Sequence, residues 1–202
     1  IKENVETVLG GGMPALMVTD PPYGVEYDAK WRKQSKLTKG GAFGKVLNDD
    51  QAMWQEVWGH FPGDVAYVWT ASWHIPVSFE ALRGASFEIR SLIIWAKPSL
   101  IISRGHYHWQ HEPCAYAVRK GSNAGWIGDR KQTTLWEISH QVSDTGHSTQ
   151  KPLEAMARGI RNHKGDVFDP FLGSGTTLLA CEKLKRTCYG LELSPAYCDV
   201  IL

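Results

Sequence analysis

Short apolar runs alternate with segments of helical pattern along most of this chain. Runs typical of buried strands are ALMVT, DVAYVWT, RSLIIWAK, HEPCAYAVRKG, GDVFD and TCYGLEL, which begin at residues 15, 64, 90, 111, 165 and 187. A helix or turn is predicted at the N-terminus, and helices over DDQAMWQEVWGHF, from HSTQKP to about His163, over TTLLACEKLK, and from Pro195 onward. Strands that alternate with helices predict an α/β fold. Its mostly parallel sheet should carry helices on both faces and bind ligands at the carboxyl ends of its strands.

Two segments lack this regular pattern. Residues 28–46 contain a Gly-Gly pair and no acid after Asp28, a composition that predicts a mobile basic loop. The basic residues of this loop are Lys30, Arg32, Lys33, Lys36, Lys39 and Lys45. Residues 121–146 are polar and show no clear period, so they are predicted to form a loop or a short insertion.

Composition adds few constraints. The 202 residues are 43% hydrophobic and 21% charged, as in ordinary globular proteins, and predict a single domain over residues 1–202. No apolar run approaches the ~20 residues of a membrane span, and no signal peptide is evident, so we expect a cytoplasmic protein without a membrane partner. The four cysteines form no C-x-x-C pair and predict reduced thiols. A net charge of +1 neither favours nor excludes nucleic acid, because a basic face can be offset by acids elsewhere.

The sequence TDPPYG follows the first predicted strand. Each proline fixes φ at about −65°, lacks an N–H and pushes the preceding residue out of the helical region. The backbone is therefore stiff and extended, and it presents Asp20 and Tyr23 at a strand end. An acid and an aromatic residue held in this way are suited to clamp a small, flat molecule that forms hydrogen bonds.

The sequence DPFLGSGTT, which begins at Asp169, is a glycine-rich turn between a predicted strand and a predicted helix. Its glycines let the backbone approach a ligand and expose N–H groups at the helix N-terminus. A phosphate-binding loop requires a lysine where Thr176 stands, and a dinucleotide fingerprint requires a small residue where Leu178 stands, so both are disfavoured. Glu192 ends the next predicted strand, where an acid can bind ribose hydroxyls. A tight turn followed by a solvated glutamate stays open as the structural alternative.

The ordered combination of DPPYG, HSTQKP, FDPFLGSGTT and GLELSPAYC resembles the amino-methyltransferases that methylate exocyclic nitrogens of DNA bases with S-adenosylmethionine. The position of DPPYG before the glycine-rich turn is similar to the permuted β-group order of that family. The stretch IIWAKPSLIISRGHYHWQHEPCAYAVRKG is also similar to phage and prophage-type DNA modification methylases. The resemblance implies a Rossmann-like methyltransferase fold with circularly permuted motifs, in a bacterial or phage-encoded enzyme.

For the clamp, the resemblance implies a ligand: the amino group of a base flipped out of double-stranded DNA. The Asp20 carboxylate and the Pro21 carbonyl accept its two hydrogens, and Tyr23 stacks on the base. The catalytic segment is thus Asp20, Pro21, Pro22 and Tyr23. An acid at the first position is typical of N6-adenine enzymes, whereas N4-cytosine enzymes commonly carry serine there. Adenine is therefore favoured, and N4-cytosine methylation stays open, as does a catalytically silent DNA-binding relative.

For S-adenosylmethionine, the resemblance implies contacts on both sides of the pocket. Phe171 and the glycines line the cofactor, Glu192 holds the ribose, and Asp169 lies beneath the amino acid end. Lys151 faces a carboxylate, unless it is an exposed lysine beside a helix cap. The expected cofactor-binding residues are Asp20, Ser148, Thr149, Lys151, Asp169, Phe171, Gly173, Ser174, Gly175, Thr176 and Glu192.

The remaining expectations concern DNA. The six basic residues of the loop at 28–46 are expected to hold backbone phosphates, with a solvated disordered loop as the alternative. Residues 121–146 lie where a target-recognition insertion is expected, and a homodimer or an additional recognition domain stays open. The sequence HYHWQHE does not have the spacing of a metal site, so no metal is expected. It is expected to form a wall of the base pocket instead, with Tyr107 or Trp109 stacking.

Overall fold

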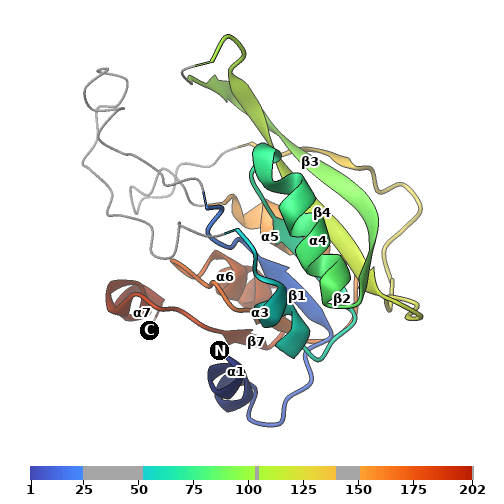
Figure 1. The fold of residues 1–202 in the computed structure, drawn as a ribbon, viewed down its shortest axis with the longest axis vertical. Coiled ribbons are helices and arrows are strands. Elements are labelled where there is room, and N and C mark those ends of the chain that lie inside the picture. The colour runs from blue at the N-terminus through green and yellow to red at the C-terminus, as the bar shows by residue number, and fades with distance from the viewer. Residues whose placement is uncertain (25–51, 103–104, 140–150, 202) are drawn as a thin grey trace.

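A mixed sheet runs through the computed structural model, which describes residues 1–24, 52–102, 105–139 and 151–201. Within these residues the sheet has seven strands in the order β5-β3-β4-β2-β1-β6-β7 (Figure 1). The strands are β1 Leu16–Thr19, β2 Val65–Trp69, β3 Phe87–Ile101, β4 Trp109–Arg119, β5 Leu135–Glu137, β6 Val167–Asp169 and β7 Cys188–Gly190.

Strand directions confirm the predicted mostly parallel sheet. The pairs β1–β2, β1–β6, β6–β7 and β3–β5 are parallel, whereas β2–β4 and β3–β4 are antiparallel. Among the described strands, β4 alone is therefore reversed and the other six point one way. In the described residues between β3 and β4 there is no helix, since an antiparallel neighbour can be reached through a hairpin and needs no crossover.

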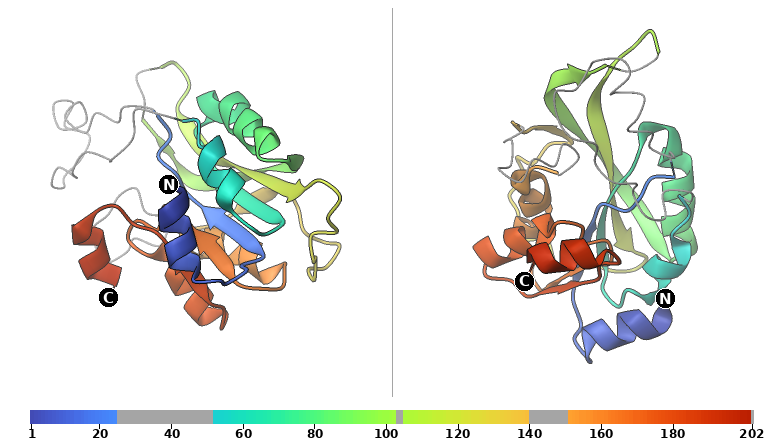
Figure 2. Two further views of the ribbon diagram at one scale, coloured as in Figure 1. Left: turned by 60° about the horizontal axis from the view of Figure 1, so that its bottom comes forward. Right: turned by 90° about the vertical axis from the view of Figure 1, so that its left-hand side faces the viewer.

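Helices cover both faces of the sheet, as Figure 2 shows in its right-hand view. The helices are α1 Lys2–Leu9, α3 Gln55–His60, α4 Ile75–Gly84, α5 Leu153–Arg161, α6 Thr176–Lys183 and α7 Pro195–Ile201, with a 3₁₀ turn η1 at Ser72–His74. One core cluster includes side chains of α1, α3 and α4, and the other includes side chains of α5 and α6. In β1, Leu16 and Val18 belong to the second cluster and Met17 to the first, because side chains alternate across a strand.

Several predicted elements change in length. The helix predicted over DDQAMWQEVWGHF begins only at Gln55, and its first three residues lie outside the described residues. β3 extends well beyond RSLIIWAK to 15 residues, whereas β7 is shorter than predicted. Helix α4 was not predicted. A proline in its first turn and buried Ser78, Ala81 and Leu82, at helical spacing, are the signals that identify it.

The two irregular segments have different outcomes. The predicted basic loop at 28–46 lies wholly outside the described residues, as do residues 140–146 of the second segment. The described part of the second segment contains β5, so a loop over its whole length is wrong. β5 pairs with the edge of β3 and buries Trp136, but three residues are too few to show a periodic pattern. Across the described residues, no helix is long and apolar enough to span a membrane.

Candidate active site

The two predicted motifs meet at one edge of the sheet. Asp20 directly follows β1, and Asp169 ends the neighbouring parallel strand β6. The chain continues from β1 to β2 on one side, while β6 lies on the other side, so the strand order reverses at this point. Ligands of open α/β sheets bind at such a reversal. The Thr19 hydroxyl donates a hydrogen bond of 2.6 Å to Asp169 Oδ1, which ties the two strand ends together.

In the clamp, Asp20 is engaged at both carboxylate oxygens. The Tyr23 hydroxyl donates to Oδ1 at 2.5 Å, and the Lys151 ammonium donates to Oδ2 at 2.7 Å. Lys151 also donates to the Tyr23 hydroxyl oxygen at 2.8 Å. Burial, and then the neighbouring carboxylates of Asp20 and Glu112, raise the pKa of Tyr23 well above its usual range. Tyr23 is therefore a neutral hydroxyl that donates to Asp20.

A second carboxylate holds the same lysine. Glu112 Oε2 lies 2.8 Å from the Lys151 ammonium, and Oε1 forms an ion pair with Lys97. Burial raises the pKa of Glu112, but the ammonium groups of Lys151 and Lys97 outweigh burial and lower this pKa to about 2. Two carboxylates and two lysines thus form one charge-balanced chain of contacts, which we call the Lys151 network: Asp20, Tyr23, Lys97, Glu112 and Lys151.

The predicted roles of Lys151 are only partly met. Its side chain is 5% exposed, so the alternative of an exposed lysine is wrong. It does face carboxylates, but these are the side chains of Asp20 and Glu112. Burial lowers the pKa of Lys151, and the two carboxylates more than reverse this effect, so the pKa is raised and the side chain is charged. Lys97 and Glu112 were not predicted as site residues. The available signal was a charged residue at the end of an apolar run in each strand: Lys97 after LIIWA and Glu112 before PCAYAV.

The glycine-rich turn connects β6 to α6 as predicted. Gly173 and Gly175 have φ values of 55° and 86°, a left-handed conformation that glycine adopts without steric cost. The carboxylate of Glu192 accepts the N–H groups of Gly173 and Ser194, each at 2.7 Å. The acid predicted to follow the second strand therefore lies against the loop itself. Ser174 is half-buried in this turn, and the buried Thr176 begins α6.

Asp169 lies beneath this turn. It is 1% exposed and accepts hydrogen bonds from the Thr19 hydroxyl and from the N–H of Phe171, the latter at 3.0 Å. Burial raises the pKa of Asp169 to about 6, although these hydrogen bonds oppose the shift. The carboxylate is consequently ionised at neutral pH and protonated in mild acid.

Trp54 joins the clamp to the glycine-rich turn. Its indole N–H donates to the Pro22 carbonyl at 3.0 Å, and its ring packs edge-on against Phe171 with 4.7 Å between centroids. A cavity of about 10 Å³ behind Pro21 and Pro22 is lined partly by Trp54 and Trp69. This volume admits at most about one water molecule, so packed aromatic rings support the clamp from behind. Trp54 was not predicted as a site residue.

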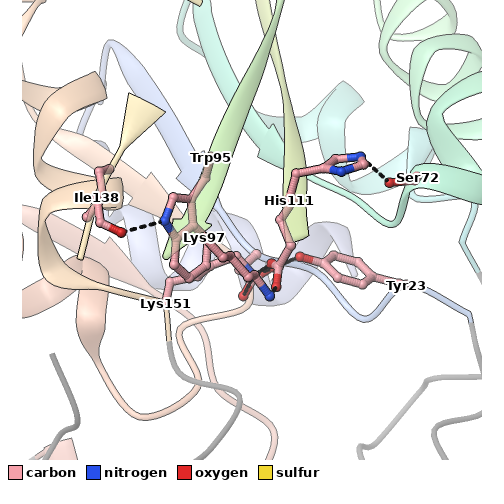
Figure 3. A network of polar contacts seen from close by, with 9 residues as sticks. Tyr23, Ser72, Trp95, Lys97, His111, Ile138 and Lys151 are labelled. Carbon is pink, nitrogen blue, oxygen red and sulfur yellow. Dashed lines mark hydrogen bonds and ion pairs between the residues drawn. The ribbon is translucent and has the colours of Figure 1, made fainter. Parts of the chain in front are cut away.

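The segment HYHWQHE, expected to form a wall of the base pocket, reaches the Lys151 network through its last residue, Glu112. Tyr107 is 92% exposed, and Trp109 packs against Trp73 with 5.7 Å between ring centroids. His111 forms a hydrogen bond with the Ser72 hydroxyl at 3.1 Å (Figure 3). In the part of the chain that the structure describes, no three His, Cys, Asp or Glu side chains gather as metal ligands do. Outside the described residues lie Ser148, Thr149, Lys30, Arg32, Lys33, Lys36, Lys39 and Lys45.

Comparison with known proteins connects this geometry to a family. Residues 15–202 match the family model described as DNA methylase. The chain belongs to this DNA methylase family. The Type II methyltransferase M.SmaI of Serratia marcescens is 28% identical over 145 residues, which are 59% of this chain and 47% of M.SmaI. The chain therefore spans about half the length of this curated relative.

Solved structures confirm the predicted Rossmann-like methyltransferase fold of this chain. The M1.HpyAVI–SAM complex has a TM-score of 0.69 at 22% identity, and the alignment covers 98% of this chain and 93% of that chain. The PvuII DNA methyltransferase, described as cytosine-N4-specific, has a TM-score of 0.66 at 15% identity and covers 98% and 82% of the two chains. At these identities the likeness establishes the fold alone.

Proposed function

We propose that this DNA methylase transfers a methyl group from S-adenosylmethionine to the exocyclic N6 of an adenine flipped out of double-stranded DNA. The observation that carries the proposal is the direct connection between the two motifs. The Asp20 clamp and the glycine-rich turn lie at adjacent strand ends, bridged by the hydrogen bond between Thr19 and Asp169. A base and a methyl donor held by these motifs lie side by side.

The residues around the glycine-rich turn fit S-adenosylmethionine. A side chain built at Gly173 would meet no atom within 4 Å, so open space lies over the turn. Glu192 retains lone pairs for ribose hydroxyls beyond the two backbone N–H groups that it accepts. Phe171, Ser174 and Thr176 complete the candidate contacts, and Asp169 supports the turn from below. When bound, the cofactor supplies an electrophilic methyl group.

The clamp supplies what the amino group of a base lacks. The nitrogen is a poor nucleophile because its lone pair is delocalised into the ring. The Asp20 carboxylate and the Pro21 carbonyl each accept one amino hydrogen, which favours a pyramidal nitrogen whose lone pair faces the methyl donor. Tyr23 orients Asp20 and offers its ring to the base. Flipping costs a few kcal/mol, which stacking and hydrogen bonds to the base edge offset.

Finer features of the proposal rest on sequence pattern. An aspartate at position 20 supports adenine, and the order of clamp before glycine-rich turn supports the permuted β-group. The basic loop at 28–46 and the segment at 121–146 are assigned to DNA contacts and target recognition. N4-cytosine methylation is the second candidate, because PvuII methyltransferase, described as cytosine-N4-specific, shares the fold.

Transfer of labelled methyl from S-adenosylmethionine to unmethylated double-stranded DNA tests this function. After digestion to nucleosides, mass spectrometry should detect N6-methyladenine with wild-type protein and none with Asp20→Ala. Calorimetry should show that the variant binds the cofactor within about twofold of wild type, because Asp20 acts on the base. Asp64→Ala, which removes a half-exposed carboxylate, is the matched control with unchanged activity.

Three outcomes contradict this proposal in different ways. N4-methylcytosine in place of N6-methyladenine would replace the base but keep the enzyme class. Near-normal turnover in Asp20→Ala would reject the clamp. Unlabelled DNA despite a bound cofactor would reject DNA methylation by this chain.

A further inference from the structure

In the Lys151 network, three oxygens surround the Lys151 ammonium, and each oxygen of Asp20 already accepts one donor. An ammonium group has three hydrogens. Lys151 donates to Asp20 Oδ2 and to the Tyr23 hydroxyl, and Glu112 Oε2 lies 2.8 Å from its Nζ as an ion-pair partner. Asp20 Oδ1 already accepts the Tyr23 hydroxyl. Under the proposed function, the amino group of a base therefore competes with Tyr23 and Lys151 for the oxygens of Asp20.

Lys151 is the donor that can move without leaving a buried charge unpaired. If its contact with Asp20 Oδ2 is lost, the ammonium keeps a carboxylate, Glu112, and the Tyr23 hydroxyl. Tyr23, by contrast, has Asp20 as its only described acceptor, and a buried hydroxyl without an acceptor is costly. The exchange at Oδ2 therefore costs less than an exchange at Oδ1.

Glu112 is placed to make this exchange possible. It comes from β4, on the far side of β2 from β1, so it is not part of the clamp segment. Lys97 pairs with its other oxygen. Trp95 lies opposite Glu112 in the β3–β4 register, and the Lys97 ammonium lies 5.0 Å from the centroid of the Trp95 ring. The Glu112 carboxylate is thus fixed by Lys97 and can stay in place when Lys151 leaves Asp20.

We propose that Glu112 is a positioning residue. It keeps the Lys151 ammonium paired while Asp20 Oδ2 exchanges the hydrogen bond from Lys151 for one from the amino group of the target base. The inference rests on the proposed methyl transfer and deepens it. Without the Glu112 charge, Asp20 is the remaining anion beside Lys151, and the lysine binds it more tightly. A neutral amino group then competes poorly for Asp20. This exchange replaces one hydrogen bond by another, and it involves no covalent bond change and no proton transfer.

Glu112→Gln tests the proposal, because glutamine keeps the size and the hydrogen-bond acceptor and removes the charge. In single-turnover assays with saturating DNA and cofactor, we expect methyl transfer to slow by about 10- to 100-fold. The Kd values for S-adenosylmethionine and DNA should stay within about twofold, because the phosphates supply most of the affinity for DNA. Rates are normalised to the fraction of protein that binds cofactor, so a loss of folded protein does not count as a loss of rate.

Two further variants separate positioning from a purely structural role. Glu112→Asp restores the charge one methylene group further away, and its rate should lie between those of Glu112→Gln and wild type. Glu88→Gln, the matched control, removes a carboxylate of β3 that pairs with Arg90 on the surface, and its rate should equal that of wild type. Equal rates for Glu112→Gln and Glu112→Asp would overturn the proposal.

A double-mutant cycle with Lys151→Met tests whether Glu112 affects the rate of methyl transfer through Lys151. If Glu112 acts through Lys151, adding Glu112→Gln to Lys151→Met should change the rate by less than about twofold. The double variant also restores charge balance, which keeps it measurable if either single variant folds poorly. A full additional loss in the double variant would overturn the proposal.

The failure of this inference differs from a failure of the proposed function. Wild-type protein that methylates DNA together with a Glu112→Gln variant of equal rate would overturn the role of Glu112 alone. Wild-type protein that binds cofactor and leaves DNA unmethylated would overturn the proposed function, and this inference with it.

Discussion

The two halves of the candidate active site are built in opposite ways. The glycine-rich turn and Glu192 form one continuous stretch, in which Glu192 accepts backbone N–H groups of Gly173 and Ser194, 19 and 2 residues away. The clamp depends on side chains that are distant in the chain, since Asp20 and Lys151 are 131 residues apart. One half is a local backbone structure and the other is a set of charges brought together by the fold.

This difference shows what each half can tolerate. A turn held by backbone N–H groups depends on φ values and on one carboxylate, so substitutions should weaken ligand binding more than folding. A buried cluster of two lysines and two carboxylates depends on every partner, because each charge left alone is costly. Substitutions in the clamp should therefore affect folding and catalysis together.

The largest expected effect on stability is that of Lys151→Met. It leaves Asp20 and Glu112 without their shared cation, and breaking a buried ion pair costs about 3 to 5 kcal/mol. Urea unfolding followed by tryptophan fluorescence measures the loss. Lys2→Met, which removes a lysine that is 68% exposed from its pair with Glu6, should change stability by less than about 1 kcal/mol. Similar losses at both positions would contradict the distinction between buried and surface charges.

Asp169→Asn should alter how stability depends on pH. The pKa of Asp169 is raised from 3.8 to about 6 by burial, so between these values the folded protein binds more protons than the unfolded protein. Its contribution to stability therefore grows as pH falls from about 6 to about 4, by about 2 to 3 kcal/mol. Asparagine does not titrate, so this gain should be missing from the variant.

Unfolding measured at pH 7.5 and at pH 4.5 compares the two proteins. Asp199→Asn, on the exposed surface of α7, is the control that should keep the wild-type dependence. A difference between wild type and Asp169→Asn that does not change with pH would show that Asp169 is not the titrating group.

In the glycine-rich half, Glu192→Ala and Gly173→Val should weaken S-adenosylmethionine binding first. The alanine variant removes the acceptor of the Gly173 N–H and the expected partner of the ribose, a loss of about tenfold or more in affinity. Valine is strained at the φ of 55° that Gly173 adopts. Calorimetry measures both, and unchanged affinity in the two variants would place the cofactor elsewhere. Leu193→Ala, at an exposed position beside Glu192, is the control.

The smallest effect is expected where the two halves meet. Trp54→Phe keeps an aromatic ring against Phe171 and removes the hydrogen bond to the Pro22 carbonyl, at a cost of about 1 kcal/mol. Trp136→Phe removes a similar bond to the Thr133 carbonyl near the edge of the sheet. Both variants should lose comparable stability, but only Trp54→Phe should slow methyl transfer. Equal rates of methyl transfer in the Trp54→Phe and Trp136→Phe variants would show that the two halves act independently of Trp54.

The same contrast explains how much could be predicted from the sequence. The glycine-rich turn, Glu192 and the strand before Asp20 were predicted because their signals are local: glycines, prolines and short apolar runs. Glu112 and Lys97 were missed, since their role is set by Lys151, which approaches them only in the folded chain. β5 was missed for a related reason, because its three residues are a strand only where they pair with β3.

The long sequence separations in the clamp also order events during synthesis and folding. The contact between Asp20 and Lys151 closes a loop of 131 residues, and that between Thr19 and Asp169 spans 150. Such distant contacts form only after a long loop has closed, so the chain loses conformational entropy before these contacts stabilise it. A chain emerging from the ribosome cannot form the clamp until position 151 has appeared, because Lys151 supplies the cation. An incomplete chain therefore has the prolines and the aspartate of the clamp but lacks the cation that holds them.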